Sequence, residues 1–267
     1  MANVAVFGCG PAGLFAAHAL KMHGLDPTVI SKKQKSVIYG AQYLHRPIPG
    51  LSDKAATADI RTIRAGAPEV YAERVYGVAT IPTSWVRVQP VSPGWDLRAT
   101  YDVAWDKYQH IVIDWTLQPD EIEEWASQFD LVISTVPLWS ICMKPNEHYF
   151  KSVNILVQKD IDLTNVIGGI EDNYVVYNGT WEHAWYRASS IFGHSSCEAR
   201  SEEHLLTNKK WEPGFKVVDT DCDCHPTLIR AGRMGTWRRG VLTHHVFEQT
   251  CAAISDQFGT IDTWSMK

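Results

Sequence analysis

The sequence of 267 residues predicts an α/β protein in which a parallel-sheet unit is interrupted by a smaller β-rich region. Three observations predict this class. An apolar run from Val4 ends in a glycine turn and continues as an alanine-rich helical stretch to about residue 23. The unbroken apolar run at 129–137 is typical of a buried parallel strand. Residues 84–117 instead have the pattern of short antiparallel strands.

The glycine turn, Gly8-x-Gly10-x-x-Gly13, predicts a site for the pyrophosphate of a dinucleotide. Gly8 makes the tight turn, Gly10 lets the backbone approach a phosphate, and Gly13 lets the helix pack against the strand. Pro11 and Ala12 then open the helix, whose unpaired N–H groups face the negative charge of the ligand. A second strand at 28–30 completes the order of a Rossmann-like fold. A purely structural strand-to-helix turn is the alternative interpretation.

The elements of the parallel unit are split along the chain. We expect residues 1–52, 118–143 and 228–267 to form a discontinuous dinucleotide-binding domain, and residues 53–117 and 144–227 to form a β-rich substrate or cap region. Within the β-rich region, strands are expected at 85–88, 95–101, 110–115, 153–157 and 174–177. The pattern also predicts helices at 119–125 and 241–257.

Composition limits the classes of function. The formal net charge is −5 and no Lys/Arg-rich run occurs, which argues against a nucleic-acid surface and favours a small-molecule partner. No apolar stretch approaches 18 residues and the first strand starts directly after Asn3, so we expect no membrane span and no signal peptide. A cytoplasmic location is expected, and a homo-oligomer is left open.

The six cysteines are scattered, which is typical of free thiols in a reducing compartment rather than of a disulfide framework. The segment 222–225, Cys-Asp-Cys-His, crowds three residues of metal-ligating type. It lacks a C-x₂-C pair and a second ligand pair at a recognisable distance. We therefore expect no metal site and interpret the segment as a loop with incidental thiols.

Three patches resemble the glutathione-reductase-like superfamily of FAD proteins, within it the branch of UDP-galactopyranose mutase and the amine oxidases. They are the glycine turn, the strand at 129–137 and the late motif 231–237, Ala-Gly-Arg-Met-Gly-Thr-Trp, with its following helix. The resemblance implies FAD as the cofactor, with the first two patches at its pyrophosphate and adenine half. It implies further cofactor-binding residues: Thr135, Gly232, Arg233, Gly235, Thr236 and Trp237. The chain is shorter than members of that branch, which implies a reduced substrate region.

The chain departs from this branch where its second strand ends. Members usually carry Glu or Asp there for the ribose hydroxyls, whereas here Ser31, Lys32 and Lys33 follow the strand. Ser31 offers a hydrogen bond to a ribose, and the lysines would favour a 2′-phosphate, as in NADP recognition. A solvated loop is the alternative interpretation of the lysines, and NADP or NAD is the alternative cofactor or co-substrate.

Four residues are candidates for the chemistry. Gln42 lies in the loop that this superfamily brings over the flavin, and His45 would exchange protons near neutral pH. In the aromatic segment 181–189, Arg187 would bind a carboxylate or phosphate and Tyr186 would orient the substrate. Strand alternation predicts Tyr186 and Arg187 on opposite faces. Core packing, or an ion pair for Arg187, is the alternative role.

Together these features predict a soluble FAD-dependent oxidoreductase that acts on a small polar or anionic substrate bound between the two regions. One alternative is a mutase-like flavoenzyme that acts on a sugar nucleotide without net redox change. Another is a dinucleotide-binding module without catalytic activity. Hydrolase, NTPase and zinc-protease functions have no support, because the motifs G-x-S-x-G, the P-loop and H-E-x-x-H do not occur.

Overall fold

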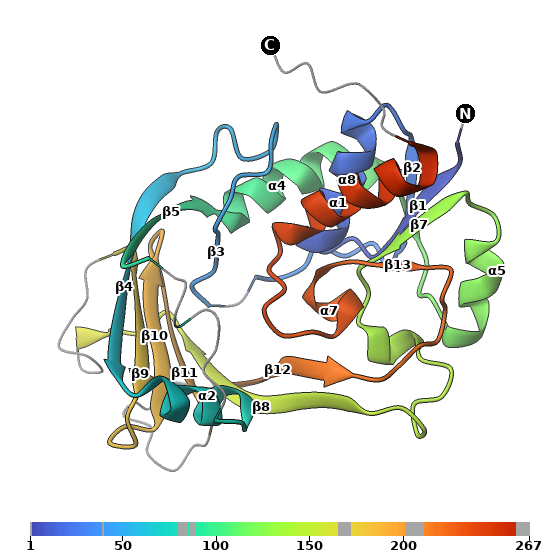
Figure 1. Cartoon of the computed structure of the whole chain (residues 1–267). Helices are drawn as coiled ribbons and strands as arrows, with labels where there is room; N and C mark the ends of the chain where they lie inside the picture. The colour runs from blue at the N-terminus through green and yellow to red at the C-terminus, as the bar shows by residue number, and fades with distance from the viewer. Residues whose placement is uncertain are drawn as a thin grey trace.

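The chain forms two sheets that lie side by side, one covered by helices and one strongly curled (Figure 1). This computed structural model describes residues 2–38, 40–79, 85, 89–164, 172–200 and 211–259. Among these residues no helix combines the length and the apolar character needed to cross a membrane. The predicted fold class, a parallel-sheet unit combined with a β-rich part, is confirmed.

The first sheet has five strands, all parallel, in the order β13-β7-β1-β2-β6. Their bounds are β1 Val4–Phe7, β2 Pro27–Ser31, β6 Val112–Asp114, β7 Leu131–Ser134 and β13 Ile229–Arg230. Every residue of β1 and β7 is buried, as expected for central parallel strands that are covered on both faces. The apolar runs in the sequence therefore correspond to the centre of this sheet.

Helices cover both faces of the parallel sheet. On one face, Val4 and Val6 of β1 pack against three helices: α1 Pro11–Met22, α4 Leu97–Tyr108 and α8 His245–Phe258 (Figure 1). On the other face, Ala5 and Phe7 belong to a second apolar cluster. That cluster includes residues of α5 Ile122–Ala126 and of the 3-10 turn Leu138–Ile141. Side chains of β1 thus alternate between the two clusters, as the pleat of a strand requires.

The second sheet has eight strands in the order β12-β8-β11-β10-β9-β4-β5-β3. Their bounds are β3 Tyr43–Leu44, β4 Thr57–Gly66, β5 Val91–Asp96, β8 Phe150–Lys159, β9 Tyr174–Gly179, β10 Trp185–Ile191, β11 His194–Ala199 and β12 Glu212–Thr220. Strands β3, β4 and β5 precede β7 in the chain and the other five follow it. The parallel pair β4 and β9 joins the two groups, whereas the remaining neighbours are antiparallel.

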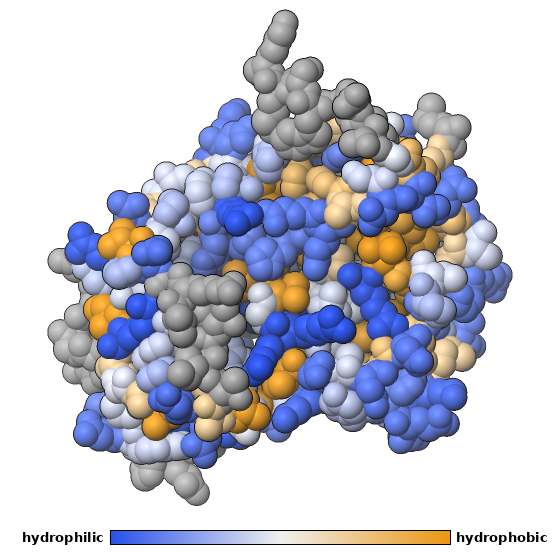
Figure 2. Space-filling view, viewed as in Figure 1, coloured by the Kyte–Doolittle hydropathy of each residue, from blue (hydrophilic) through white to orange (hydrophobic). Residues whose placement is uncertain are grey.

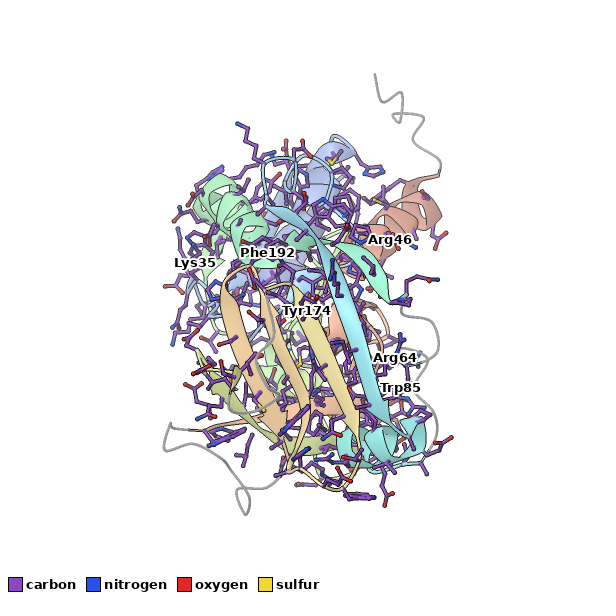
Figure 3. The ribbon with its side chains drawn as sticks, turned by 90° about the vertical axis from the view of Figure 1, so that its left-hand side faces the viewer. Lys35, Arg46, Arg64, Trp85, Tyr174 and Phe192 are labelled. Carbon is purple, nitrogen blue, oxygen red and sulfur yellow. The ribbon has the colours of Figure 1, made fainter. Side chains whose placement is uncertain are left out.

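The helix α2 Pro68–Tyr76 lies at one end of this second sheet. Figure 3 shows the sheet from outside, with Tyr174 and Phe192 toward the opposite end and Trp85 toward the end near α2. Tyr71 of α2 packs its ring against Trp85 and Tyr177, with ring centroids 5.0 and 5.2 Å away. Aromatic packing therefore fixes α2 on the sheet.

Two expectations about secondary structure between residues 95 and 115 are wrong. The strand predicted at 95–101 ends at Asp96, whose Oδ1 accepts hydrogen bonds from the N–H groups of Arg98 at 2.8 Å and Ala99 at 3.3 Å. This carboxylate caps α4, so the chain continues as a helix. The strand predicted at 110–115 is β6, which pairs with β2 in the parallel sheet instead of with antiparallel neighbours.

The remaining expectations about single elements agree more closely with the structure. The helix predicted at 119–125 consists of the 3-10 turn Pro119–Glu121 followed by α5. The helix predicted at 241–257 begins at His245, and the late motif forms the short helix α7 Gly232–Thr236. Another 3-10 turn, Gln109–Ile111, leads into β6. The strand expected at 85–88 lies, apart from Trp85, outside the described residues.

Two glycines set how closely helices approach the parallel sheet. A Cβ atom on Gly13 of α1 would lie 1.8 Å from the carbonyl oxygen of Gly8. A Cβ atom on Gly235 of α7 would lie 2.5 Å from the carbonyl oxygen of Ser134, the last residue of β7. Both obstacles are backbone atoms, which a side-chain rotation cannot move away. Only glycine therefore fits at these two contacts.

Replacing Gly13 with Ala should destabilise the fold by about 3 kcal/mol or more, because the new methyl group overlaps the Gly8 carbonyl. Alanine is the better helix former by up to about 1 kcal/mol, which is too little to offset this overlap. The matched control is Gly214→Ala in β12, where a Cβ atom would make an ordinary contact, 3.4 Å from Ile155 Cγ1. Urea unfolding should show a large loss for Gly13→Ala alone. Equal stability of the two variants would contradict the proposed contact.

Candidate functional site

A cavity of about 580 Å³ lies where the parallel strands β1, β2 and β7 end. It is lined by the glycine turn with the start of α1, the end of β2 with the loop that follows, the chain after β7 together with α7, and Thr243 before α8. Figure 2 shows that the face seen in Figure 1 is hollowed between the helix-covered part and the curled sheet. Eight of the predicted cofactor-binding residues line the cavity: Gly8, Gly10, Pro11, Ala12, Ser31, Lys32, Thr135 and Arg233.

Backbone atoms form the first wall of the cavity. Gly8 has a φ of +103°, and a Cβ atom there would lie 2.7 Å from Thr135 Oγ1. Gly10 is the N-cap of α1 and Pro11 its first residue. Among the described residues, a Cβ atom on Gly10 would meet only Ser36 Oγ, at 3.3 Å. The N–H groups of the first helical turn have no acceptor within the helix, so this wall suits an anion.

The loop at 32–37 forms the second wall of the cavity. Tyr101 of α4 holds this loop in place through hydrogen bonds. The Tyr101 hydroxyl donates a hydrogen bond to the carbonyl of Cys9 at 3.1 Å and accepts one from the N–H of Ser36 at 3.0 Å. Burial raises the pKa of Tyr101, so the hydroxyl keeps the proton that it donates. Lys35 pairs with Asp102 of the same helix at 2.7 Å. The helix that the sequence did not predict therefore positions this wall.

The charged side chains found to line the cavity are all positive. Lys32, Lys35 and Arg233 line it, and among the residues that the structure describes no acidic side chain does. Ser31 is the last residue of β2, at the position where the resemblance led us to expect an acid. Arg233 Nε donates a hydrogen bond to the carbonyl of Val241 at 3.0 Å, which orients its guanidinium group. The lining therefore favours a ligand with negative charge.

The other residues predicted from the late motif shape the wall without lining it. Thr236 Oγ1 donates a hydrogen bond to the carbonyl of Gly232 at 2.7 Å, within α7. Gly232 has a φ of +73°, a backbone conformation that favours glycine. Trp237 is buried between the rings of Phe150 and Phe215, whose centroids lie 5.6 and 5.7 Å away. Gly235 and Gly13 make the close backbone contacts described above.

Neither Gln42 nor His45 lines the cavity. Gln42 is exposed, at the edge of the second sheet. The His45 ring stacks on Tyr43 of β3, with a centroid distance of 4.4 Å. Burial, with the charges of Arg187 and His245, lowers the pKa of His45 to about 4. The imidazole is thus neutral at pH 7, which differs from the titration near neutral pH that the sequence led us to expect.

A charged cluster connects three strands of the second sheet. Glu198 of β11 pairs through Oε1 with Arg187 Nη1 of β10 at 3.3 Å, and through Oε2 with Lys216 Nζ of β12 at 2.5 Å. The three side chains are only 22%, 14% and 15% exposed for Arg187, Glu198 and Lys216. The Lys216 ammonium lies 4.9 Å from the centroid of the buried Tyr186 ring. We name Tyr186, Arg187, Glu198 and Lys216 the β10–β12 cluster.

A β-bulge brings Tyr186 and Arg187 into the same cluster. Trp185 pairs with Ala199 whereas Arg187 pairs with Glu198, so the register shifts at Tyr186. Strict alternation would have put Tyr186 and Arg187 on opposite faces. That expectation is wrong because the extra residue interrupts the pleat. Sequence periodicity carries no signal for such a bulge.

The β10–β12 cluster has an excess of positive charge. Burial alone would raise the pKa of Glu198, but Lys216 and Arg187 outweigh burial and lower the pKa to about 2. Burial disfavours the charged form of Arg187, yet Glu198 and neighbouring tyrosines hold the Arg187 pKa above its ordinary value. Arg233 of the cavity also interacts electrostatically with Arg187 and Glu198. Three cations thus share one carboxylate, which favours an anionic ligand.

Two buried polar atoms of this cluster, the Nε of Arg187 and the hydroxyl oxygen of Tyr186, lack a hydrogen-bond partner among the described residues. A buried donor without a partner costs roughly 1–3 kcal/mol. A ligand with carboxylate or phosphate oxygens would satisfy it. The geometry is therefore compatible with the anion-binding role predicted for Arg187.

Replacing Glu198 with Gln should destabilise the protein by about 3 kcal/mol at pH 7, because two buried cations would lose their counter-charge. The Glu198 pKa is lowered in the folded state, so its stabilising effect is complete above about pH 4.5 and fades as the pH falls toward 2. Urea unfolding at pH 7, 4 and 3 should show the difference between wild type and variant shrink.

The control for this experiment is Glu248→Gln. Glu248 pairs with Arg46 at the surface, where both side chains are more than half exposed (Figure 3). Removing that pair should change stability little. If Glu198→Gln were as stable as the wild type at pH 7, or if its deficit were the same at pH 3, the assigned charges of the cluster would be wrong.

No protein-family model matches the sequence, and no curated protein matches it. Solved structures do match. Reduced UDP-galactopyranose mutase has a TM-score of 0.59 at 13% identity, over 100% of this chain and 98% of that chain. A variant of 2-methyl-3-hydroxypyridine-5-carboxylic acid oxygenase has a TM-score of 0.53 at 13% identity, over 96% of this chain and 82% of that chain.

A flavoprotein/dehydrogenase from Cytophaga hutchinsonii has a TM-score of 0.52 at 12% identity, over 94% of this chain and 76% of that chain. At such identities the similarity concerns the fold, and a shared fold does not specify chemistry. The fold that the sequence indicated is confirmed by this similarity, whereas the finer resemblance to the mutase branch stays a prediction. This chain has the fold of these three proteins.

Proposed function

We propose that this protein is an FAD-dependent oxidoreductase that acts on a small polar or anionic substrate. One observation carries the proposal. Among the described residues, the cavity combines a glycine turn at a helix N-terminus with three cationic side chains and no acidic one, which suits the diphosphate of a dinucleotide. The similar structures support it, since they include a flavoprotein/dehydrogenase and an oxygenase.

The residues that line the cavity fit this cofactor. The N–H groups of Gly10 and Ala12 would donate to the pyrophosphate beside Pro11, which has no N–H, and Arg233 would add a charge-assisted contact. Ser31 would take one ribose hydroxyl, whereas a carboxylate would take two. Lys32 beside Ser31 would suit a 2′-phosphate, so NADP is the alternative cofactor that the same cavity permits.

FAD supplies hydride or electron transfer when it is bound, and the protein supplies binding and orientation. Arg187 would bind a carboxylate or phosphate of the substrate, because its buried Nε has no partner among the described residues. Burial raises the pKa of Tyr43 to about 12, so this neighbour of Arg187 stays protonated. His45, neutral at pH 7, would act as a hydrogen-bond partner.

A mutase-like activity on a sugar nucleotide is the second candidate. It is favoured by the similarity to UDP-galactopyranose mutase over 98% of that chain. The excess of positive charge formed by Arg187, Lys216 and Arg233 would also suit a nucleotide diphosphate. A dinucleotide-binding module without catalysis is the third. The cytoplasmic location and a homo-oligomeric state, both considered from the sequence, stay predictions.

The purified protein should show flavin absorbance between about 300 and 600 nm and release FAD on denaturation, because the cavity would retain the cofactor. Gly10→Val should lower FAD affinity at least about 100-fold, since its side chain would occupy the space in front of the helix N-terminus. Gly10→Ala, whose methyl group would approach only Ser36 Oγ, should lose less. Titration of the apoprotein with FAD measures these affinities. A colourless protein that binds NADP but not FAD would overturn the cofactor assignment.

Substrate class can be tested with anionic probes on the FAD-loaded protein. Benzoate and UDP should perturb the flavin spectrum, and Arg187→Gln should weaken the tighter of the two at least about tenfold, because a bidentate contact is lost. Arg46→Gln, which removes an exposed arginine, should leave both affinities unchanged. Tighter binding of benzoate supports the oxidoreductase, and tighter binding of UDP supports the mutase-like candidate. Equal affinities in wild type and Arg187→Gln would remove Arg187 from the substrate site.

A further inference from the structure

Four side chains of metal-ligating type lie together outside the cavity. They are Cys142, His148, Cys222 and Cys224, and the atoms that each offers all lie within 4.8 Å of one another. Cys142 follows the 3-10 turn after β7, His148 precedes β8, and the other two follow β12. Figure 1 shows β8 and β12 side by side, so the start of one strand lies near the end of the other. The chain thus gathers ligands from two segments about 80 residues apart.

The distances match those of one tetrahedral metal ion. Zn–S bonds of about 2.3 Å and Zn–N bonds of about 2.0 Å place two sulfur atoms about 3.8 Å apart, and sulfur and nitrogen about 3.5 Å apart. Cys142 Sγ lies 3.6 Å from Cys222 Sγ and 3.9 Å from Cys224 Sγ. His148 Nδ1 lies 3.3 Å from Cys142 Sγ and 3.7 Å from Cys224 Sγ. A disulfide would need about 2.05 Å between sulfur atoms, and all three cysteines are free.

Neighbouring groups orient these ligands. Asp223 Oδ1 lies 3.5 Å from His148 Nε2, on the side of the ring away from the sulfur atoms. A carboxylate in that position keeps the proton on Nε2 and leaves Nδ1 free to bind a metal. The N–H of Lys144 points at Cys142 Sγ at 3.4 Å. Arg230 donates hydrogen bonds to the carbonyls of Cys222, at 2.7 Å, and Cys224, so it fixes the loop that carries both cysteines.

We propose that Cys142, His148, Cys222 and Cys224 bind one Zn²⁺ ion as a structural site. Three thiolates and one imidazole are a ligand set that selects zinc, and four protein ligands leave no position open for a substrate. The absence of an open position separates this site from the chemistry proposed for the cavity. The inference does not depend on FAD binding.

The segment 222–225 alone did not predict this site. His225, the residue that completes the Cys-Asp-Cys-His sequence, is not a ligand: its Nδ1 contacts Glu123 Oε1 at 2.7 Å and its Nε2 contacts the carbonyl of Ile141 at 2.6 Å. The two missing ligands come from Cys142 and His148, which are too far away in sequence for a spacing rule. The expectation of no metal site rested on local spacing, and the folded chain supplies the ligands that the spacing lacks.

A zinc ion at this site would link two segments of the chain: the one that leaves the parallel sheet after β7, and the one that returns to it at β13. Cys142 lies five residues after the cavity residue Pro137, and Arg230 lies three residues before Arg233. A bound ion would join these two segments, as a crosslink does, and hold α7 against β7. Metal binding to the folded state alone would also raise the stability of the whole chain.

The direct test is elemental analysis of the full-length protein, purified under reducing conditions without chelator. We expect about one zinc per chain. Cys222→Ser and His148→Ala should each lose most of it, and Asp223→Asn should bind zinc about 10-fold more weakly or worse. Cys251→Ser, which alters a cysteine outside the cluster, is the matched control and should keep its zinc.

If the protein contains no zinc after purification, the proposed site is tested by adding metal ions to the apoprotein. Apoprotein with reduced thiols should bind one Co²⁺ with the visible bands of tetrahedral thiolate coordination, read at wavelengths beyond flavin absorbance, and Zn²⁺ should abolish them. Failure of the reduced wild type to bind either ion would overturn the proposal. So would iron as the bound metal, a Cys142–Cys222 disulfide in the freshly purified protein, or full zinc content in Cys222→Ser.

Discussion

The cavity at the ends of the parallel strands depends on the contact between Gly13 of α1 and the carbonyl of Gly8. Because no side chain stands between them, the first turn of α1 lies against the end of β1 and its N–H groups face the cavity. The second close approach, of Gly235 to Ser134, brings α7 to the end of β7 in the same way. The cavity exists because two helices reach the ends of neighbouring strands without a side chain between them.

The second sheet depends on this arrangement in turn. Its strands come from segments before and after β7, and the parallel pairing of β4 with β9 joins them. Arg233 of α7 then interacts electrostatically with Arg187 and Glu198 of that sheet. One cation thus links the proposed cofactor cavity to the β10–β12 cluster. This link is the physical reason for proposing that cofactor and substrate meet at the boundary of the two sheets.

Local patterns predicted the parts of this fold that depend on neighbouring residues. The glycine turn, the buried strand β7 and the closing helix were all visible as short motifs or apolar runs. Three features were missed because they depend on contacts distant in sequence or on a single atom. Asp96 ends a strand-like run by capping α4, and the bulge at Tyr186 brings Tyr186 and Arg187 into one cluster. The four proposed zinc ligands come together only after folding. His45 has the right residue type for proton transfer, yet burial lowers its pKa to about 4, so the ring does not titrate near neutral pH.

We propose that the ends of β1, β2 and β7 form a dinucleotide site. Hydrogen exchange of the backbone amides, measured on the apoprotein with and without saturating FAD, tests it most directly. We expect slower exchange in the first turn of α1, in the loop at 32–37 and around Arg233, with little change in strands β4 and β5 of the second sheet, which do not line the cavity. FAD binding that left those three segments unchanged, or that protected a different region, would contradict the claim.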